Sequence, residues 1–321
     1  MDLIYAALGL VILLLAGDSL VRGAVNMSLR LGVPALIVSL TIVAFGTSAP
    51  ELLIAIQAID DHVPGLAMGN VVGSNTANIL LVLGVPAILS GLSTGECDTR
   101  KSYFQMMAAT VLFMVLAMGG VITWVQGLVL LAALGLMLSS AFRQAIHHRR
   151  AVAAGLEEET EEDEDVEGAD PDMPWWKVIL FLMLGLIGLP LGADLLVDAS
   201  TSIARHYGVS ETVIGLTLVA LGTSLPELAT TVMAAMRNQA EVAMGNVIGS
   251  NMFNLLAIIG IASFVGPIPV ESGILQFDLW VMAGASLLLA PFVLLKWHMG
   301  RVWGAVLVVL YVVYILAVLA A

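Results

Sequence analysis

Long apolar runs separated by short polar breaks make up most of this chain. The runs Ile122–Phe142, Val178–Leu196 and Val302–Ala320 each have the roughly 20 residues that an α-helix needs to cross a bilayer. Breaks rich in Gly, Pro and charged residues divide the chain into ten such spans, which lie at 3–29, 33–59, 64–91, 103–121, 123–143, 175–205, 210–236, 241–266, 276–296 and 301–320. The pattern predicts an all-α membrane protein with ten transmembrane helices.

The sequence repeats itself at a constant offset of 176 residues. The segment Gly46–Glu51 (GTSAPE) returns as Gly222–Glu227 (GTSLPE), and Ala67–Asn75 (AMGNVVGSN) returns as Ala243–Asn251 (AMGNVIGSN). The offset covers five predicted helices, an odd number, so equivalent helices must cross the membrane in opposite directions. We therefore expect two inverted five-helix repeats, an architecture found in many secondary transporters.

An acidic stretch separates the two repeats. Residues 157–172 carry eleven Asp and Glu side chains, so this one segment accounts for most of the formal net charge of −13. A segment with so few apolar residues cannot bury enough surface to fold, and we expect a disordered tether, with Ca²⁺ sensing as the alternative. The predicted organisation is a first five-helix repeat at 1–147, an acidic cytoplasmic linker at 148–173 and a second five-helix repeat at 174–321.

Composition agrees with a membrane location. Hydrophobic residues make up 60% of the chain and charged residues 12%, with a mean hydropathy of +1.00, which excludes a soluble protein of this size. The start, Met1-Asp2-Leu3, has no basic region, so we expect a retained first helix and not a signal peptide. Cys97 is the only cysteine, so no disulfide can form within the chain.

Lys and Arg are distributed unequally between the two sides of the predicted helices. The set of loops and helix ends that includes the linker holds ten of them: Arg30, Arg100, Lys101, Arg143, Arg149, Arg150, Lys177, Arg237, Lys296 and Arg301. The opposite set holds only Arg205. Because cytoplasmic loops are enriched in Lys and Arg, we expect the linker in the cytoplasm and both termini outside.

Each repeat places one glutamate inside an otherwise apolar span. An ionised group at the centre of a membrane helix costs roughly 2.5–3.5 kcal/mol on insertion scales, so Glu51 and Glu227 are expected to face a polar cavity. The alternative is a carboxylate that is protonated or paired with a neighbouring arginine. Thr47 and Thr223 lie four residues earlier, on the same helix face as each glutamate.

A proline precedes each glutamate and removes a backbone donor. Pro50 and Pro226 cannot donate to the carbonyls of Gly46 and Gly222, so each helix is expected to kink and expose carbonyl oxygen beside the hydroxyl and the carboxylate. Hard cations favour oxygen ligands of this kind, and irregular backbone is tolerated at membrane depth where it lines a cavity. The sequence therefore predicts a cation site shared by the two repeats.

The third and eighth spans add a second polar face. Polar side chains recur there at intervals of four, as Asn70, Ser74, Asn78, Asn246, Ser250 and Asn254. Glycines in the same segments form small-xxx-small patterns that bring helices close together. We expect both roles, with the glycines packing the helices and the polar side chains lining the site.

Charged residues also occur in the first and sixth spans. Asp18 and Arg22 lie one helical turn apart and are expected to pair. Asp194 and Asp198 occupy the equivalent positions without such a partner, so we expect them to line a water-accessible edge. We expect neither pair to bind a transported ion directly.

At its repeated motifs the sequence resembles the calcium/cation antiporter superfamily, in particular the sodium/calcium exchangers and their bacterial and archaeal relatives. The resemblance covers nearly the whole membrane part, through GTSAPE with GNVVGSNTAN and GTSLPE with GNVIGSNMFN. It implies a multi-pass protein of the prokaryotic inner membrane that exchanges Ca²⁺ for Na⁺ by alternating access. It also implies that the second, third, seventh and eighth helices surround the ions while the first and sixth slide across them. Neither a cofactor nor a nucleic-acid partner is expected.

The resemblance also implies a set of ion ligands. The Ca²⁺ ligands would be Glu51, Glu227, Thr47 and Thr223. The Na⁺ sites would add Ser48, Ser74, Ser224, Ser250 and the carbonyls of Ala44 and Ala220, with Asn78 and Asn254 near the middle. Some relatives, including potassium-dependent ones, have aspartate at the position of Asn254, so the asparagine argues against K⁺ co-transport.

Three other functions are alternatives to Ca²⁺/Na⁺ exchange. A Ca²⁺/H⁺ antiporter of the same superfamily usually has a GN-x-x-E-type motif where this chain has GTS-x-PE. A cation channel would not need two kinked half-sites that each carry a carboxylate. An intramembrane enzyme would need a catalytic or metal constellation, whereas all five histidines lie at or near segment ends.

Overall fold

The computed structural model describes residues 1–94, 97, 99–153, 169–208 and 220–320. In the first half the helical segments, with π-helical turns labelled η, are α1 (Asp2–Leu31), α2 (Ala35–Val38), η1 (Ser39–Val43), α3 (Ala44–Thr47), α4 (Ala49–Asp60), α5 (Pro64–Ala77), η2 (Asn78–Val82), α6 (Gly84–Leu89), α7 (Arg100–Ala117) and α8 (Trp124–Ala153). In the second half they are α9 (Trp175–His206), α11 (Ala220–Gly222), α12 (Leu225–Met236), α13 (Ala240–Met252), η5 (Phe253–Ile258), α14 (Ile259–Ala262), η6 (Ile274–Asp278), α15 (Leu279–Leu288), α16 (Ala290–Leu294) and α17 (Arg301–Ala320).

Seven helices in the described part of the chain are long and apolar enough to cross a membrane, and a bent pair of helices raises this number to eight. Two further predicted spans correspond to α7, which begins with Arg100 and Lys101, and to 210–236. Residues 209–219 of that last span, and 154–168 of the predicted linker, lie outside the described residues. The structure is thus helical as predicted, with seven to eight candidate membrane helices.

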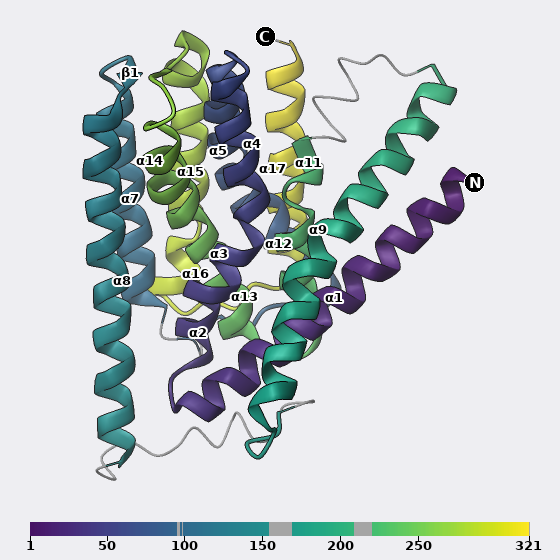
Figure 1. Cartoon of the computed structure of the whole chain (residues 1–321), viewed down its shortest axis with the longest axis vertical. Helices are drawn as coiled ribbons and strands as arrows, with labels where there is room; N and C mark the ends of the chain where they lie inside the picture. The colour runs from purple at the N-terminus through teal and green to yellow at the C-terminus, as the bar shows by residue number, and fades with distance from the viewer. Residues whose placement is uncertain (95–96, 98, 154–168, 209–219, 321) are drawn as a thin grey trace.

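The helices α1 and α9 lie side by side and cross the rest of the bundle at a slant (Figure 1). Glycines allow the close approach: a Cβ on Gly185 would lie 2.5 Å from the Cβ of Leu20, and one on Gly9 would lie 2.7 Å from the backbone nitrogen of Leu196. The pair supplies most of a smaller hydrophobic cluster, which also includes residues of α2 and η1 and Ala229 of α12, while Val21 and Val25 of α1 pack in the larger cluster of the other helices. The molecule therefore contains a helix pair and a larger core bundle.

Short strand contacts join the loops at the ends of the bundle. The strand β1 (Val121–Ile122) pairs antiparallel with β2 (Ile268–Pro269), and a single bridge joins Leu92 to Met299. Ile268 lies 176 residues after Leu92, and their partners, Ile122 and Met299, lie 177 residues apart, so the two contacts use equivalent positions to within one residue.

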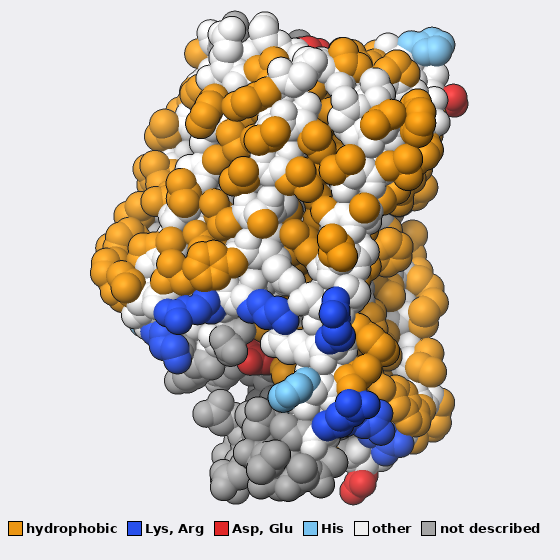
Figure 2. Space-filling model, turned by 90° about the vertical axis from the view of Figure 1, so that its left-hand side faces the viewer, with side chains coloured by type: hydrophobic (Ala, Val, Ile, Leu, Met, Phe, Trp, Pro, Cys, Tyr) orange, Lys and Arg blue, Asp and Glu red, His pale blue; other side chains and the backbone are white. Residues whose placement is uncertain are grey.

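The outer surface is suited to lipid. Large apolar side chains are exposed along α17, where Val302 is 77% exposed and Val309 59%. Figure 2 shows apolar side chains covering most of one face, with Lys and Arg gathered toward its lower end. Such a surface is the one expected of helices in contact with acyl chains.

Candidate cation site

The first GTS-x-PE motif breaks a helix. The axes of Ala35–Thr47 and Ala49–Asp60 differ by 41°, and Ser48 lies between them with φ −87° and ψ 5°. Pro50 occupies the first turn of α4, where a helix needs no donor from that residue. The predicted kink is confirmed in this half.

The second motif repeats this geometry. Ser224 has φ −91° and ψ 2°, and it separates the short α11 from α12, which carries Pro226 in its first turn. Glu51 and Glu227 thus both lie in the first turn of a helix. Free backbone N–H groups and the helix dipole favour a negative charge at that place.

The two π-helical segments lie at the polar face of the third and eighth spans. Asn78 opens η2 directly after α5, and Asn254 is the second residue of η5 after α13. Ser74 and Ser250 lie one turn earlier, in the preceding α-helices. A π-helical turn changes the direction of side chains along a helix and frequently marks a functional site.

Most of the predicted ligands are buried, either at the helix breaks or on the third and eighth spans. Nine of their side chains are at most 5% exposed: Glu51, Glu227, Thr47, Ser48, Ser224, Ser74, Ser250, Asn78 and Asn254. Ala44 is fully buried, and Thr223 is half-buried. Ala220 opens α11, and its side chain lies outside the described residues.

Hydrogen bonds connect each motif to the opposite half of the chain. The Ser48 hydroxyl donates to Oε1 of Glu227 at 3.3 Å. The Thr47 hydroxyl lies 3.3 Å from Oδ1 of Asn246, and the equivalent Thr223 hydroxyl lies 3.4 Å from Oδ1 of Asn70. The site is therefore built between the two halves, with side chains from both.

Several buried polar atoms of this site have no hydrogen-bond partner among the described residues. They are Oε2 of Glu51, Oε2 of Glu227, Oδ1 of Asn78, Oδ1 and Nδ2 of Asn254, Oγ of Ser224, Nδ2 of Asn70 and Oδ1 of Asn75. Each unsatisfied buried group costs about 1–3 kcal/mol, and more if it is charged. Six of these eight atoms are oxygens, the ligand type that Na⁺ and Ca²⁺ prefer, so a bound cation would satisfy those oxygens but not the two amide nitrogens.

The backbone around Ala44 is already hydrogen-bonded. Its carbonyl accepts from the backbone N–H of Ser48 at 3.1 Å, and the Thr47 hydroxyl lies 3.3 Å away. A cation bound to the Ala44 carbonyl oxygen would therefore compete with the hydrogen bond from the Thr47 hydroxyl. In the described part of the chain, no group of three or more His, Cys, Asp or Glu side chains could hold a metal ion.

Sequence reasoning gave no role to a second pair of asparagines at the site. Asn251 accepts a hydrogen bond from Nδ2 of Asn78 at 3.0 Å, and its own amide lies 3.8 Å from the sulfur of Met106. Asn75, its equivalent, lies 3.7 Å from the sulfur of Met282. Both asparagines belong to the repeated GSN motif, which was the available signal.

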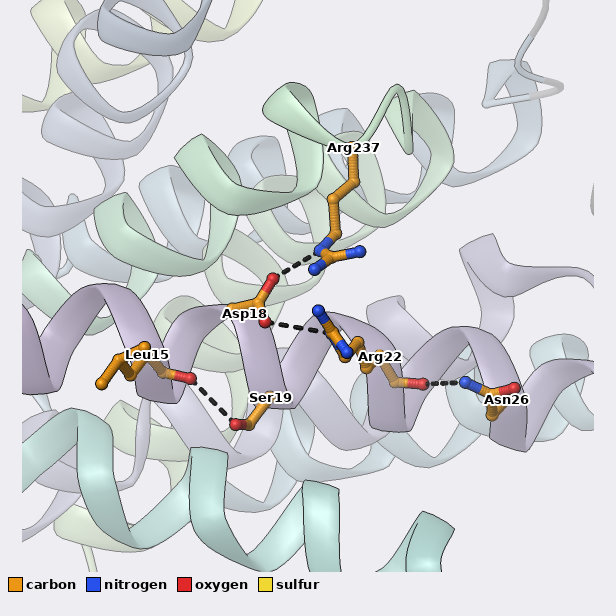
Figure 3. Close-up of polar contacts among 6 residues, drawn as sticks. All are labelled: Leu15, Asp18, Ser19, Arg22, Asn26 and Arg237. Carbon is orange, nitrogen blue, oxygen red and sulfur yellow. Dashed lines mark hydrogen bonds and ion pairs between the residues drawn. The ribbon is translucent and has the colours of Figure 1, made fainter. Parts of the chain in front are cut away.

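The predicted pair of Asp18 and Arg22 is present, and it has a third member (Figure 3). Nε of Arg22 lies 3.0 Å from one carboxylate oxygen of Asp18, and Nε of Arg237, from the end of α12, donates to the other. The sequence indicated Arg237 only as a cytoplasmic positive charge. Asp194 and Asp198 are both exposed, and the water-accessible edge stays a prediction.

Comparison with known proteins places these features in one family. Residues 1–142 and 177–320 match the family model described as sodium/calcium exchanger protein. The chain is 32% identical to the putative antiporter CaxA of Alkalimonas amylolytica over 317 residues, which cover 97% of this chain and 96% of that one. It is also 32% identical to the sodium/calcium exchanger MaX1 of Methanosarcina acetivorans, over 96% of this chain and 95% of that one. A solved structure of the sodium-calcium exchanger NCX_Mj, soaked with Na⁺ and Sr²⁺, matches with a TM-score of 0.81 at 31% identity, covering 98% of this chain and 97% of that one.

Proposed function

This chain belongs to the sodium/calcium exchanger protein family, and we propose that it exchanges Ca²⁺ for Na⁺ across a prokaryotic inner membrane. The observation that carries the proposal is the pair of buried carboxylates, Glu51 and Glu227, each with an oxygen that lacks a hydrogen-bond partner among the described residues. Two negative charges in one buried site match one Ca²⁺ or two Na⁺. Competition of these ions for the same two carboxylates would couple their movements.

The proposed Ca²⁺ ligands are the two glutamates with Thr47 and Thr223. The proposed Na⁺ sites add side chains or carbonyls from Ser48, Ser74, Ser224, Ser250, Ala44 and Ala220, with Asn78 and Asn254 near the middle. Support comes from the burial of these side chains and from the hydrogen bonds that link the Thr and Ser hydroxyls across the two halves.

The proposed architecture is ten transmembrane helices in two inverted five-helix repeats, with both termini outside. The loop contacts at β1–β2 and at Leu92–Met299, which are equivalent to within one residue, support the repeat. Both chain ends lie in the upper half of the molecule, and the Lys and Arg side chains of one face gather toward the lower end (Figures 1 and 2). By the positive-inside rule that lower end is cytoplasmic.

Alternating access would use the two-part construction of the fold. Helices α1 and α9 pack closely against each other through glycines and supply most of one hydrophobic cluster, so they would move as one body against the helices that carry the ligands. The site helices α4, α5, α12 and α13 all belong to the core bundle.

Purified protein in proteoliposomes provides the test of this function. We expect an outward-directed Na⁺ gradient to drive Ca²⁺ uptake, because both ions need the same carboxylates, and a K⁺ gradient alone to drive none. The measurement is Ca²⁺ uptake with Na⁺, K⁺ or H⁺ gradients imposed one at a time. Uptake driven equally well by a proton gradient without Na⁺ would assign H⁺ coupling, and flux that needs no counter-ion would assign a channel.

A further inference from the structure

The two halves of the site differ one helical turn beyond the glutamates. Thr231 is fully buried, donates its hydroxyl to the backbone carbonyl of Glu227 at 2.7 Å, and accepts a hydrogen bond from Nδ2 of Asn246 at 3.1 Å. The equivalent residue in the first half, 176 positions earlier, is Ala55, which has no polar side-chain atom. The bond to the asparagine therefore exists in one half only.

Because of this difference, the two equivalent asparagines, Asn70 and Asn246, differ in how many of their amide atoms are hydrogen-bonded. The amide of Asn246 is used at both ends, because Nδ2 donates to Thr231 and Oδ1 lies 3.3 Å from the Thr47 hydroxyl. Asn70 has Oδ1 at 3.4 Å from the Thr223 hydroxyl, but its Nδ2 is buried without a partner among the described residues. One amide is fixed in orientation, and the other is not.

We propose that Thr231 is a positioning residue, which acts on ion binding through Asn246 and Thr47. Nδ2 of Asn246 is held by Thr231 and lies 3.4 Å from the backbone carbonyl of Glu227, so the amide presents only its oxygen to Thr47. The Thr47 hydroxyl can donate to that oxygen or to the Ala44 carbonyl, each at 3.3 Å, and in either case it keeps its lone pairs for a cation. If the amide turned over, its N–H would take a lone pair of Thr47 as acceptor. The half-site of Glu227 and Thr47 is thus preorganised, whereas that of Glu51 and Thr223 adapts to the ion that arrives. This role rests on the proposed ion exchange at the same site.

The test compares the Ca²⁺ dependence of uptake in four proteins. Thr231→Val removes the hydroxyl at nearly the same shape, Thr231→Ser restores it, and Thr230→Val is the matched control. Thr230 is equally buried on the same helix, and its hydroxyl bonds the carbonyl of Pro226. We expect Thr231→Val to raise the KM for Ca²⁺ about tenfold with little change in maximal rate, the effect of one hydrogen bond at a buried site. The Ser variant and the control are expected to stay near wild type.

A wild-type KM in a folded Thr231→Val protein, or equal changes in it and in Thr230→Val, would overturn the positioning role. Ala55→Thr extends the test, because it supplies the missing partner of Asn70 and is expected to lower the KM. If Thr231→Val does not fold, an unchanged KM in Ala55→Thr overturns the proposal. Absence of Na⁺-driven uptake in the wild type would instead reject the proposed function itself.

A second inference comes from the charged cluster of Asp18, Arg22 and Arg237 (Figure 3). It joins α1, of the mobile pair proposed above, to α12, which carries Glu227. The side chains of Arg237 and Asp18 are only 9% and 19% exposed. Next to them Gly17 packs on α12: a Cβ there would lie 3.0 Å from the carbonyl oxygen of Ala229. This end of the pair is closed against the core bundle.

The equivalent positions in the opposite half are exposed and carry only negative charges. Asp194, Asp198 and Asp61 are the counterparts of Asp18, Arg22 and Arg237, and all three are exposed. Leu53, the counterpart of Ala229, is 67% exposed, whereas Ala229 is 7% exposed. Three carboxylates repel one another, so these side chains cannot form the same ion pairs.

We infer that the ion pair of Asp18 and Arg237 acts as a latch: it favours the conformation seen here, in which α1 packs on α12, over the alternative conformation in which α9 packs on α4. Bringing α9 against α4 would place acidic side chains together, whereas α1 against α12 joins opposite charges. The latch therefore sets the resting balance of the proposed alternating access, and it does not itself bind the transported ions.

The populations of the two conformations can be measured without transport, from the distance between spin labels at the end of α9 and the end of α4. Tyr207→Cys at the end of α9 and Val63→Cys after α4, both exposed, are introduced in a Cys97→Ala background. We expect Arg237→Gln to raise the population with a short interlabel distance about tenfold, since it leaves Asp18 with a weaker partner. Asp61→Arg, which supplies the missing cation opposite Asp194, is expected to shift the population in the same direction.

Arg301→Gln, an exposed basic residue at the start of α17, is the control and is expected to leave the distances unchanged. Unchanged distances in both Arg237→Gln and Asp61→Arg would overturn the latch. If Arg237→Gln does not fold, the Asp61→Arg result alone decides. A single distance in every variant, with Na⁺-driven Ca²⁺ exchange intact, would reject the latch and leave the exchange function standing.

Discussion

Glu51→Gln and Glu227→Gln are each expected to lower Na⁺-driven Ca²⁺ uptake at least about a hundredfold. Glutamine preserves the size of the side chain but removes one of the two negative charges at the site. Removing one partner of a buried charge interaction typically costs about 3–5 kcal/mol, because the remaining charge is left uncompensated in a low dielectric. The measurement is the initial rate of Ca²⁺ uptake into proteoliposomes at saturating Na⁺ gradient.

The matched control is Glu271→Gln, which removes the same charge from an exposed position before η6. It is expected to transport at the wild-type rate. Size-exclusion profiles of all three variants check that the loss arises in the site and not from unfolding. Wild-type uptake by either site variant would remove that glutamate from the proposed ligands.

Backbone features of this site could be predicted because they follow from single residues. Pro50 and Pro226 lack an N–H, which predicted the helix breaks beside Ser48 and Ser224, although Pro190 lies inside α9 without ending that helix. The long apolar runs likewise predict membrane helices, since only a helix satisfies its backbone in lipid. The π-helical turns at Asn78 and Phe253 were not predicted, because they depend on tertiary packing and have no residue signature of comparable strength.

Contacts between distant segments could be predicted only where the sequence repeat related the residues of the two halves. The repeat indicated that Thr47 and Thr223 play equivalent parts, and each does bond an asparagine of the opposite half. Arg237 broke the symmetry, because its counterpart is Asp61, and no pattern in the sequence pointed it toward Asp18. Differences between the halves, more than their likeness, therefore needed the structure.

Exchange is expected to be electrogenic, with a membrane potential that speeds or slows it. Glu51 and Glu227 supply two negative charges, which one Ca²⁺ or two Na⁺ would neutralise. A third Na⁺ gives the loaded site a charge of +1, so each cycle moves one net charge. That charge is worth about 2.3 kcal/mol per 100 mV, or about a fifty-fold bias on the Ca²⁺ gradient. Ca²⁺ uptake under K⁺-diffusion potentials set with valinomycin measures it, and voltage-insensitive Na⁺-coupled flux would reject the third Na⁺.

Asn254 is the residue that keeps the charge of the site at two in this proposal. Its side chain is 1% exposed, and neither amide atom has a partner among the described residues, whereas Asn78 donates to Asn251 at 3.0 Å. Asn254→Asp therefore adds a carboxylate without breaking an existing hydrogen bond. A third negative charge has to be neutralised by a proton or by another monovalent ion before the loaded site can cross. We expect uptake by this variant to depend on pH or on K⁺ where the wild type depends on neither, as measured by Ca²⁺ uptake across a pH series with and without K⁺. Wild-type behaviour in both series would place position 254 outside the ion pathway and return the choice of coupling ion to the two glutamates and their hydroxyl neighbours.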